Sequence, residues 1–171
     1  MKRTKCYEHY PFSSVFLANL LQGMIYFLGA LIISMIGYLW LMVYVSFVLA
    51  LEVRLLRKSC INCYYYGKRC FSGKGKVSAL FFKKGSTAQF NKEAIQFKDI
   101  LPDFLISLAP VFIGIVLFIK SHDMILLALV FSLVLLAFPG TGFIRSTLAC
   151  PFCKQRIIGC SAERLFHKTK K

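Results

Sequence analysis

Six of the seven cysteines fall into two sets with the same internal spacing. Each set follows the pattern C-x2-C-x6-C, and the second set begins 90 residues after the first. The members are Cys60, Cys63 and Cys70 in the first motif and Cys150, Cys153 and Cys160 in the second motif. The same spacing at a fixed offset indicates an internal repeat. Because thiolates bind soft metals and carry redox chemistry, these six cysteines are the candidates for chemistry in this chain.

The two C-x2-C pairs predict a metal site. Such a pair lets two thiolates face one ion from a tight turn, and two pairs supply the tetrahedral set that zinc prefers. The leading hypothesis is one zinc ion held by Cys60, Cys63, Cys150 and Cys153. Two separate three-cysteine sites, each with a fourth ligand from elsewhere, are the second arrangement, and an iron–sulfur cluster is the third.

Thiol redox chemistry without a metal is the alternative. The stretch 150–153, Cys-Pro-Phe-Cys, resembles the active-site sequence of glutaredoxins, and the resemblance implies a reactive first thiol at a helix N-terminus. No βαβ unit precedes it, however, and residues 143–149 instead lead out of a membrane helix. Under this alternative, Cys70 and Cys160 are the working thiols of a redox, electron-transfer or metal-handling protein.

The elements that must position these motifs are membrane helices. Of the 171 residues, 57% are apolar and 15% aromatic, and the mean hydropathy is +0.64, which is too apolar for a soluble domain. From His9 to Leu51, 43 residues contain no Asp, Glu, Lys or Arg. Since a helix needs ~20 residues to cross a ~30 Å hydrocarbon core, this stretch predicts two helices, Phe12–Ile33 and Tyr38–Leu56, with a turn at Ser34–Gly37.

A second apolar region predicts two more helices, Leu101–Ile119 and Met124–Ile144, separated by residues 120–123. The predicted fold is an all-α membrane protein whose four transmembrane helices form two parallel hairpin repeats, each followed by a cytoplasmic cysteine motif. Residues 1–75 form the first repeat, residues 76–100 an interfacial linker, and residues 101–171 the second repeat with a basic tail.

The basic residues predict the orientation in the membrane. The formal net charge is +15 at pH 7, and 21 of the 22 Lys and Arg residues lie outside the two short turns, in the termini, in the central loop and at the span ends that adjoin them. By the positive-inside rule these segments face the cytoplasm, where thiols stay reduced and anionic lipid headgroups are the expected partner. Their spread over every such segment, without a binding module, disfavours nucleic acid. The added ligand candidates on this side are Cys6, His9 and His167.

The linker is predicted to lie along the membrane surface. The apolar stretch Val77–Phe82 precedes Lys83 and Lys84, a pattern typical of the interface. Residues 86–89, Ser-Thr-Ala-Gln, form a capping-box pattern, which predicts a short helix that ends near Phe97.

Polar residues within the predicted spans are few. Asn19 and Gln22 lie one turn apart in the first span, where hydrogen bonding between helices is favoured over a substrate path. Glu52 is placed at the cytoplasmic end of the second span, with Arg54 or a lipid headgroup as its expected partner. Because no charged residue is predicted deep in a span, ion pumping and proton coupling are disfavoured.

Known catalytic patterns are absent from the sequence, including a hydrolase elbow, a dinucleotide fingerprint and a kinase set. The four-helix plan and the stretches 60–70 and 149–154 resemble a group of uncharacterised small membrane proteins of methanogenic archaea. That resemblance implies no activity. We therefore expect a multi-pass cell-membrane protein with a cytoplasmic metal-binding cysteine layer and a structural, accessory or assembly role.

Overall fold

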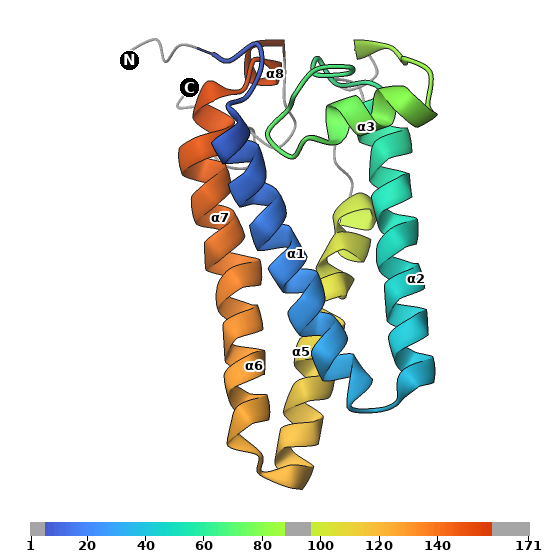
Figure 1. Ribbon diagram of the computed structural model, residues 1–171, viewed down its shortest axis with the longest axis vertical. Coiled ribbons are helices and arrows are strands. Elements are labelled where there is room, and N and C mark those ends of the chain that lie inside the picture. Colours follow the sequence, from blue (N-terminus) through green and yellow to red (C-terminus); the bar gives the residue numbers. More distant parts are fainter. Residues whose placement is uncertain (1–5, 88–96, 159–171) are drawn as a thin grey trace. The chain divides into compact units, whose positions relative to one another are not determined.

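Long helices organise the part of this chain that the structure describes (Figure 1). The computed structural model describes residues 6–87 and 97–158, with side chains for residues 6–87 and 104–157. In these ranges four helices are long and apolar enough to cross a membrane: Phe12–Ser34, Tyr38–Cys60, Phe104–Ser121 and Met124–Phe152. The four predicted spans are confirmed as helices of that kind, and the fourth continues beyond its predicted end at Ile144.

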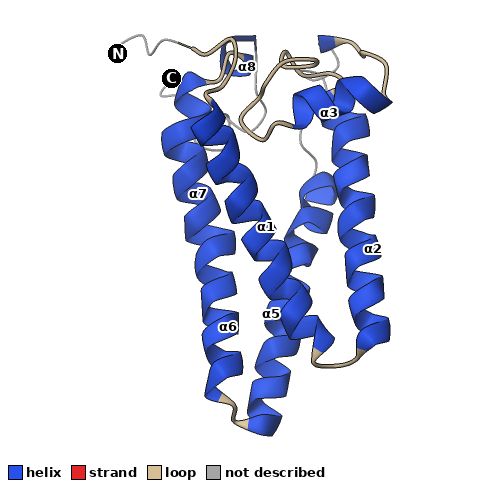
Figure 2. Cartoon of the chain, in the orientation of Figure 1, coloured by secondary structure: helices blue, strands red, loops and turns tan. Residues whose placement is uncertain are grey.

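All regular elements in the described ranges are helical (Figure 2). The first two spans are α1 (Phe12–Ser34), α2 (Tyr38–Leu55) and a π-helical turn that continues α2, η1 (Leu56–Cys60). The last two spans are α5 (Phe97–Ser121) and a run of α6 (Met124–Leu135), η2 (Leu136–Gly140), α7 (Thr141–Ile144), η3 (Arg145–Ala149) and η4 (Cys150–Phe152). Two short helices complete the set, α3 (Lys74–Phe81) and α8 (Gln155–Ile158).

Turn residues set the ends of these helices. Gly37 has a φ of 149°, which favours glycine, and it separates α1 from α2. Asp123 begins α6, because its carboxylate accepts a hydrogen bond from the Ile125 N–H at 2.9 Å. Pro139 lacks an N–H, and the helix around it takes the π-helical form of η2. The predicted helix after Ser86 falls mainly on residues 88–96, outside the described residues.

The chain divides into two compact units, and each combines segments from both halves of the sequence. We call the first the cysteine unit, because its three segments contain every cysteine: Met1–Asn19, Val53–Phe97 and Ile144–Lys171. The second, the helix unit, consists of Leu20–Glu52 and Lys98–Phe143.

The helix unit has an aliphatic core. Its buried residues form two clusters, one of Ile25, Ile32, Leu126, Val130 and Leu133 and the other of Ile33, Tyr44, Val48, Leu51 and Ile106. Glycines allow the helices to approach closely: a Cβ at Gly114 would lie 2.4 Å from Val130 Cγ2. Small residues at such contacts are typical of membrane helices, which pack without a hydrophobic driving force between them.

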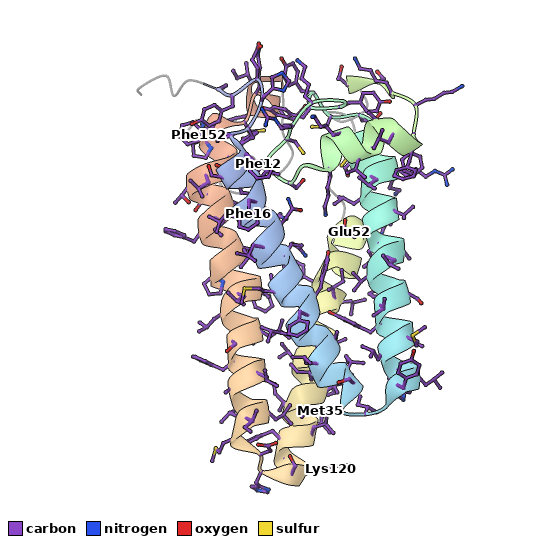
Figure 3. The ribbon with its side chains drawn as sticks, in the orientation of Figure 1. Phe12, Phe16, Met35, Glu52, Lys120 and Phe152 are labelled. Carbon is purple, nitrogen blue, oxygen red and sulfur yellow. The ribbon has the colours of Figure 1, made fainter. Side chains whose placement is uncertain are left out.

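The outer faces of the spans are apolar. Phe12 and Phe16 on α1 are 71% and 60% exposed, and Leu39 on α2 is 74% exposed (Figure 3). In each of the four spans, at most 22% of the residues in an apolar stretch of 18 are buried within the protein. An apolar exterior of this extent is expected where lipid is the solvent, so the structure supports a membrane protein.

Two polar residues in the spans form hydrogen bonds that the sequence did not indicate. Asn19 Nδ2 donates to the Val15 carbonyl on its own helix at 2.7 Å and to the Ser72 carbonyl at 3.2 Å, so it ties α1 to a loop. Glu52 Oε1 accepts a hydrogen bond from the Tyr26 hydroxyl at 2.5 Å. Because the second span continues to Cys60, Glu52 lies further inside that span than the sequence suggested.

Candidate functional site

The two C-x2-C pairs form the same backbone turn. In the first motif, the Cys63 N–H donates to the Cys60 carbonyl at 3.4 Å, and in the second the Cys153 N–H donates to the Cys150 carbonyl, also at 3.4 Å. A further turn follows each pair. The Tyr66 N–H donates to the Cys63 carbonyl at 3.1 Å, and the Arg156 N–H donates to the Cys153 carbonyl at 3.2 Å. The two pairs therefore share this pattern of backbone hydrogen bonds.

A π-helical turn leads into both motifs. η1 ends at Cys60, and η3 ends at Ala149, one residue before Cys150. Wider helical turns of this kind occur frequently at functional sites. The sequence contains no identity at these positions that would have revealed the match.

Side chains of each motif bind the backbone of the other within the cysteine unit. Gln155 is 2% exposed, and its Oε1 accepts from the Tyr64 N–H at 2.8 Å and lies 3.8 Å from Cys63 Sγ. The Tyr65 hydroxyl accepts from the Lys154 N–H at 2.9 Å. The structure therefore brings the first and second motifs together.

Two buried tyrosines lie among the cysteines. Tyr10 and Tyr65 are 1% and 2% exposed, and their ring centroids are 5.6 Å apart. Burial, together with negative charge on neighbouring thiols, raises the pKa of both phenols, and that of Tyr65 reaches about 12 although the hydrogen bond from the Lys154 N–H lowers it. The cysteines that act in this way on one or both tyrosines are Cys6, Cys63, Cys150 and Cys153.

The segment before α1 is joined to both motifs. The Tyr7 N–H donates to the Phe152 carbonyl at 3.0 Å, and its carbonyl accepts from the Tyr65 hydroxyl at 2.6 Å. Next to it, Cys6 Sγ lies 4.0 Å from the Cys153 carbonyl oxygen. The Tyr10 hydroxyl donates to the Ala149 carbonyl at 2.7 Å. Cys6, predicted as an added ligand, is thus placed beside the second motif.

Cys70 lies in a different environment from the paired cysteines. Its Sγ accepts a hydrogen bond from the Gly75 N–H at 3.3 Å and lies 3.5 Å from Ser72 Oγ. Gly75 belongs to the first turn of α3, which begins after Gly73.

Lysines surround the exposed edge of this region. Lys68 Nζ lies 4.6 Å and Lys154 Nζ 5.2 Å from the ring centroid of Tyr64. Hydrogen bonds from Lys154 and Lys68 lower the pKa of the Tyr64 phenol. Lys154 also forms an ion pair of 2.8 Å with Glu8. The charges are exposed, so they orient side chains more than they stabilise the fold.

The six described cysteines are half-buried, and no disulfide joins any of them. Among residues 6–87 and 97–158, no three His, Cys, Asp or Glu side chains form a group able to hold a metal ion. His9 is exposed. Cys160 and His167 lie outside the described residues. The predicted ligands that the structure describes thus lie in one unit, and residues 6–87 and 97–158 do not contain a complete ligand set.

Sequence reasoning missed Gln155 and the role of the tyrosines. Tyr64, Tyr65 and Tyr66 directly follow Cys63, and this run was the available signal in the sequence. Nothing in the sequence marks Gln155 as the residue that joins the two motifs.

No protein-family model, curated protein or solved structure matches this chain.

Proposed function

We propose that this chain is a multi-pass membrane protein whose two cysteine motifs share one metal ion, zinc, that fastens the cysteine unit. The observation that carries the proposal is the pair of equal C-x2-C turns, which are joined through Gln155 and Tyr65. Four thiolates on two such turns are the ligand chemistry of structural zinc. In this proposal the ligands are Cys60, Cys63, Cys150 and Cys153.

The surroundings of the thiols support a structural role for the metal. The cysteines are half-buried, and the neighbouring tyrosines are engaged in hydrogen bonds with backbone groups. A metal that binds the folded cysteine unit, and not the unfolded chain, adds its binding free energy to the stability of the fold. The protein would then act as a structural, accessory or assembly component of the membrane, and an iron–sulfur cluster is the second choice of cofactor.

The proposed orientation places the cysteine unit in the cytoplasm. The support is the distribution of basic residues, of which 21 of 22 lie in the termini, in the central loop and at the span ends that adjoin them. A tag inserted at Gly73 or at either terminus is expected to be accessible from the cytoplasm only. External labelling of the Gly73 tag would overturn this orientation.

Metal analysis of the full-length protein, purified without oxygen, tests the metal proposal. Cys60→Ser and Cys150→Ser are each expected to remove most of the metal, and the double variant is expected to lose little more, because the two residues act as one unit. Cys70→Ser is the matched control and is expected to retain the metal. Loss of metal in Cys70→Ser as well would favour separate three-cysteine sites. A metal-free wild-type protein would overturn the proposal.

A thiol-redox or metal-handling protein is the second candidate, because Cys70 Sγ accepts the Gly75 N–H at the start of α3. In that case Cys70, with Cys160, performs the chemistry. Alkylation rates measured for each cysteine by mass spectrometry separate the two candidates. The metal proposal expects Cys60, Cys63, Cys150 and Cys153 to be protected until a chelator is added. The redox candidate expects Cys70 to react fastest, with or without a chelator.

A further inference from the structure

The helix α3 presents its large apolar side chains outward. Leu80 and Phe81 are 81% and 74% exposed, and Val77 is 41% exposed. The buried residues of this helix are instead the small ones, Gly75 and Ser78, and Ser78 is 0% exposed. This is the reverse of the pattern of a helix on the surface of a water-soluble protein.

Polar contacts hold the inner face of α3 in place. The Ser78 hydroxyl donates to the Leu56 carbonyl at 3.4 Å, and the Gly67 N–H donates to the Gly75 carbonyl at 2.9 Å. A Cβ at Gly75 would lie only 2.2 Å from the Tyr65 carbonyl oxygen. The helix therefore cannot turn its apolar side chains inward without losing these contacts.

The charge and position of α3 indicate what covers its outer face. Lys74 and Lys76 lie within the helix, and Lys83 and Lys84 follow it. The contact with Leu56 places α3 at the end of the second membrane span. Val53, one turn earlier in that span, is 51% exposed and so belongs to the apolar outer surface. Lysines that flank an apolar helix at a span end are complementary to anionic lipid headgroups.

We propose that α3 is an interfacial anchor, in which Leu80 and Phe81 insert into the acyl-chain boundary of the surrounding membrane while the flanking lysines contact the phosphates of anionic phospholipids. The anchor holds the first cysteine motif at the membrane surface, because Gly75 at the start of α3 is hydrogen-bonded to this motif. Its N–H donates to Cys70 Sγ, and its carbonyl accepts from the Gly67 N–H. This inference is independent of whether the cysteines bind a metal.

Tryptophan quenching in vesicles tests the anchor. Trp40 is the only tryptophan, so Phe81→Trp in a Trp40→Phe background gives a single reporter on α3. The full-length protein is placed in phosphatidylcholine vesicles with about 30% phosphatidylglycerol, which carries the anionic charge, and with lipid brominated on its acyl chains. Phe152→Trp in the same background is the matched control, because Phe152 is half-buried and its ring lies 5.0 Å from that of Tyr7.

Brominated lipid is expected to quench Phe81→Trp at least about half as strongly as it quenches Trp40 of the wild-type protein, which is on an exposed span face, and to quench Phe152→Trp far less. Leu80→Trp is a second reporter on the same face, in case Phe81→Trp does not fold. Quenching by aqueous iodide in place of brominated lipid would overturn the anchor. Protection from both quenchers would also overturn it, because a partner protein or a second copy would then cover the face.

The lysines are tested by a Lys76→Gln, Lys83→Gln and Lys84→Gln variant that carries the same reporter. In the Phe81→Trp reporter protein with its lysines unchanged, quenching by brominated lipid is expected to increase when phosphatidylglycerol is added. In the triple lysine variant this increase is expected to be at least about twofold smaller. An unchanged response to phosphatidylglycerol would contradict the role of the lysines.

Discussion

The cysteine unit and the helix unit bury different kinds of side chain. The helix unit buries mainly aliphatic residues, such as Ile32 and Leu133, both 0% exposed, although its core also contains Tyr44. The cysteine unit buries Tyr10, Tyr65 and Gln155, each of which forms a hydrogen bond with the backbone. The difference follows from the backbone: long helices satisfy their own N–H and C=O groups, whereas turns and loops need side-chain partners.

The two units should therefore lose different amounts of stability when the same kind of substitution is made in each. A Cβ added against loop backbone in the cysteine unit should cost more than a Cβ added against a side chain in the helix unit, and the loss of a hydrogen bond should also cost more in the cysteine unit. Matched substitutions in the two units test this comparison.

Glycine to alanine changes should give the largest contrast. At Gly75 a Cβ would lie 2.2 Å from the Tyr65 carbonyl and 2.7 Å from the Lys68 carbonyl, so the loop itself must move, and we expect Gly75→Ala to lower the free energy of unfolding by about 3 kcal/mol. At Gly29 the nearest atom is the Tyr44 hydroxyl, 2.3 Å away, which is the end of a side chain. Gly29→Ala should cost about 1 kcal/mol.

Hydrogen exchange with mass spectrometry in detergent checks both glycine variants. Exchange should rise in residues 60–82 for Gly75→Ala and in α1 and α2 for Gly29→Ala. Equal effects of the two variants would contradict the expectation that a clash with backbone is less easily relieved than a clash with a side chain.

Tyrosine to phenylalanine changes should give the next largest contrast. Tyr65→Phe removes two hydrogen bonds and leaves the Tyr7 carbonyl and the Lys154 N–H without them, which should cost about 2–3 kcal/mol. Tyr44→Phe removes a single bond of 3.3 Å to the Ile106 carbonyl in the helix unit and should cost about 1 kcal/mol or less. Thermal unfolding of purified protein measures both. A larger loss for Tyr44→Phe would reverse the comparison.

Polar contacts between spans should matter less than those in the cysteine unit. Tyr26→Phe removes the hydrogen bond to Glu52 and should cost about 1 kcal/mol, because such bonds between membrane helices contribute little on average. Glu52→Gln should have a smaller effect, since the amide oxygen still accepts from Tyr26. The same unfolding assay provides the test, and a loss as large as that of Tyr65→Phe would mark the pair as more than a packing contact.

The smallest effect is expected at the surface pair of Glu8 and Lys154. The hydrogen bond and charge of Lys154 hold the pKa of Glu8 below its usual value of 4.5. A lowered carboxyl pKa in the folded state adds stability that is present above the unfolded pKa and is lost as the pH falls through the folded pKa. The melting temperatures of wild type and Glu8→Gln should differ slightly at pH 7 and converge as the pH falls through the lowered pKa of Glu8. A difference that grows in acid would contradict this sign.

Much of the helical architecture was predictable from residue types. The uncharged stretch from His9 to Leu51 is too long for one helix, and the observed helices Phe12–Ser34 and Tyr38–Cys60 fill it with a turn at Gly37. The end of the fourth span was not predictable in the same way. Polar residues after Ile144 suggested that the helix stops, but helical turns continue through η3 and η4 to Phe152.

The sequence alone determined the membrane class, the four spans and the equal spacing of the cysteines, because these depend on local composition and on distance along the chain. The tertiary structure decided which groups meet. Gln155 accepts the N–H of Tyr64, 91 residues away, and Tyr10 reaches the carbonyl of Ala149, 139 residues away. Such pairings form only where the tertiary fold brings distant loops together. No periodicity in the sequence predicts them, because the position and burial of a group, and not its residue type alone, determine its hydrogen-bond partner.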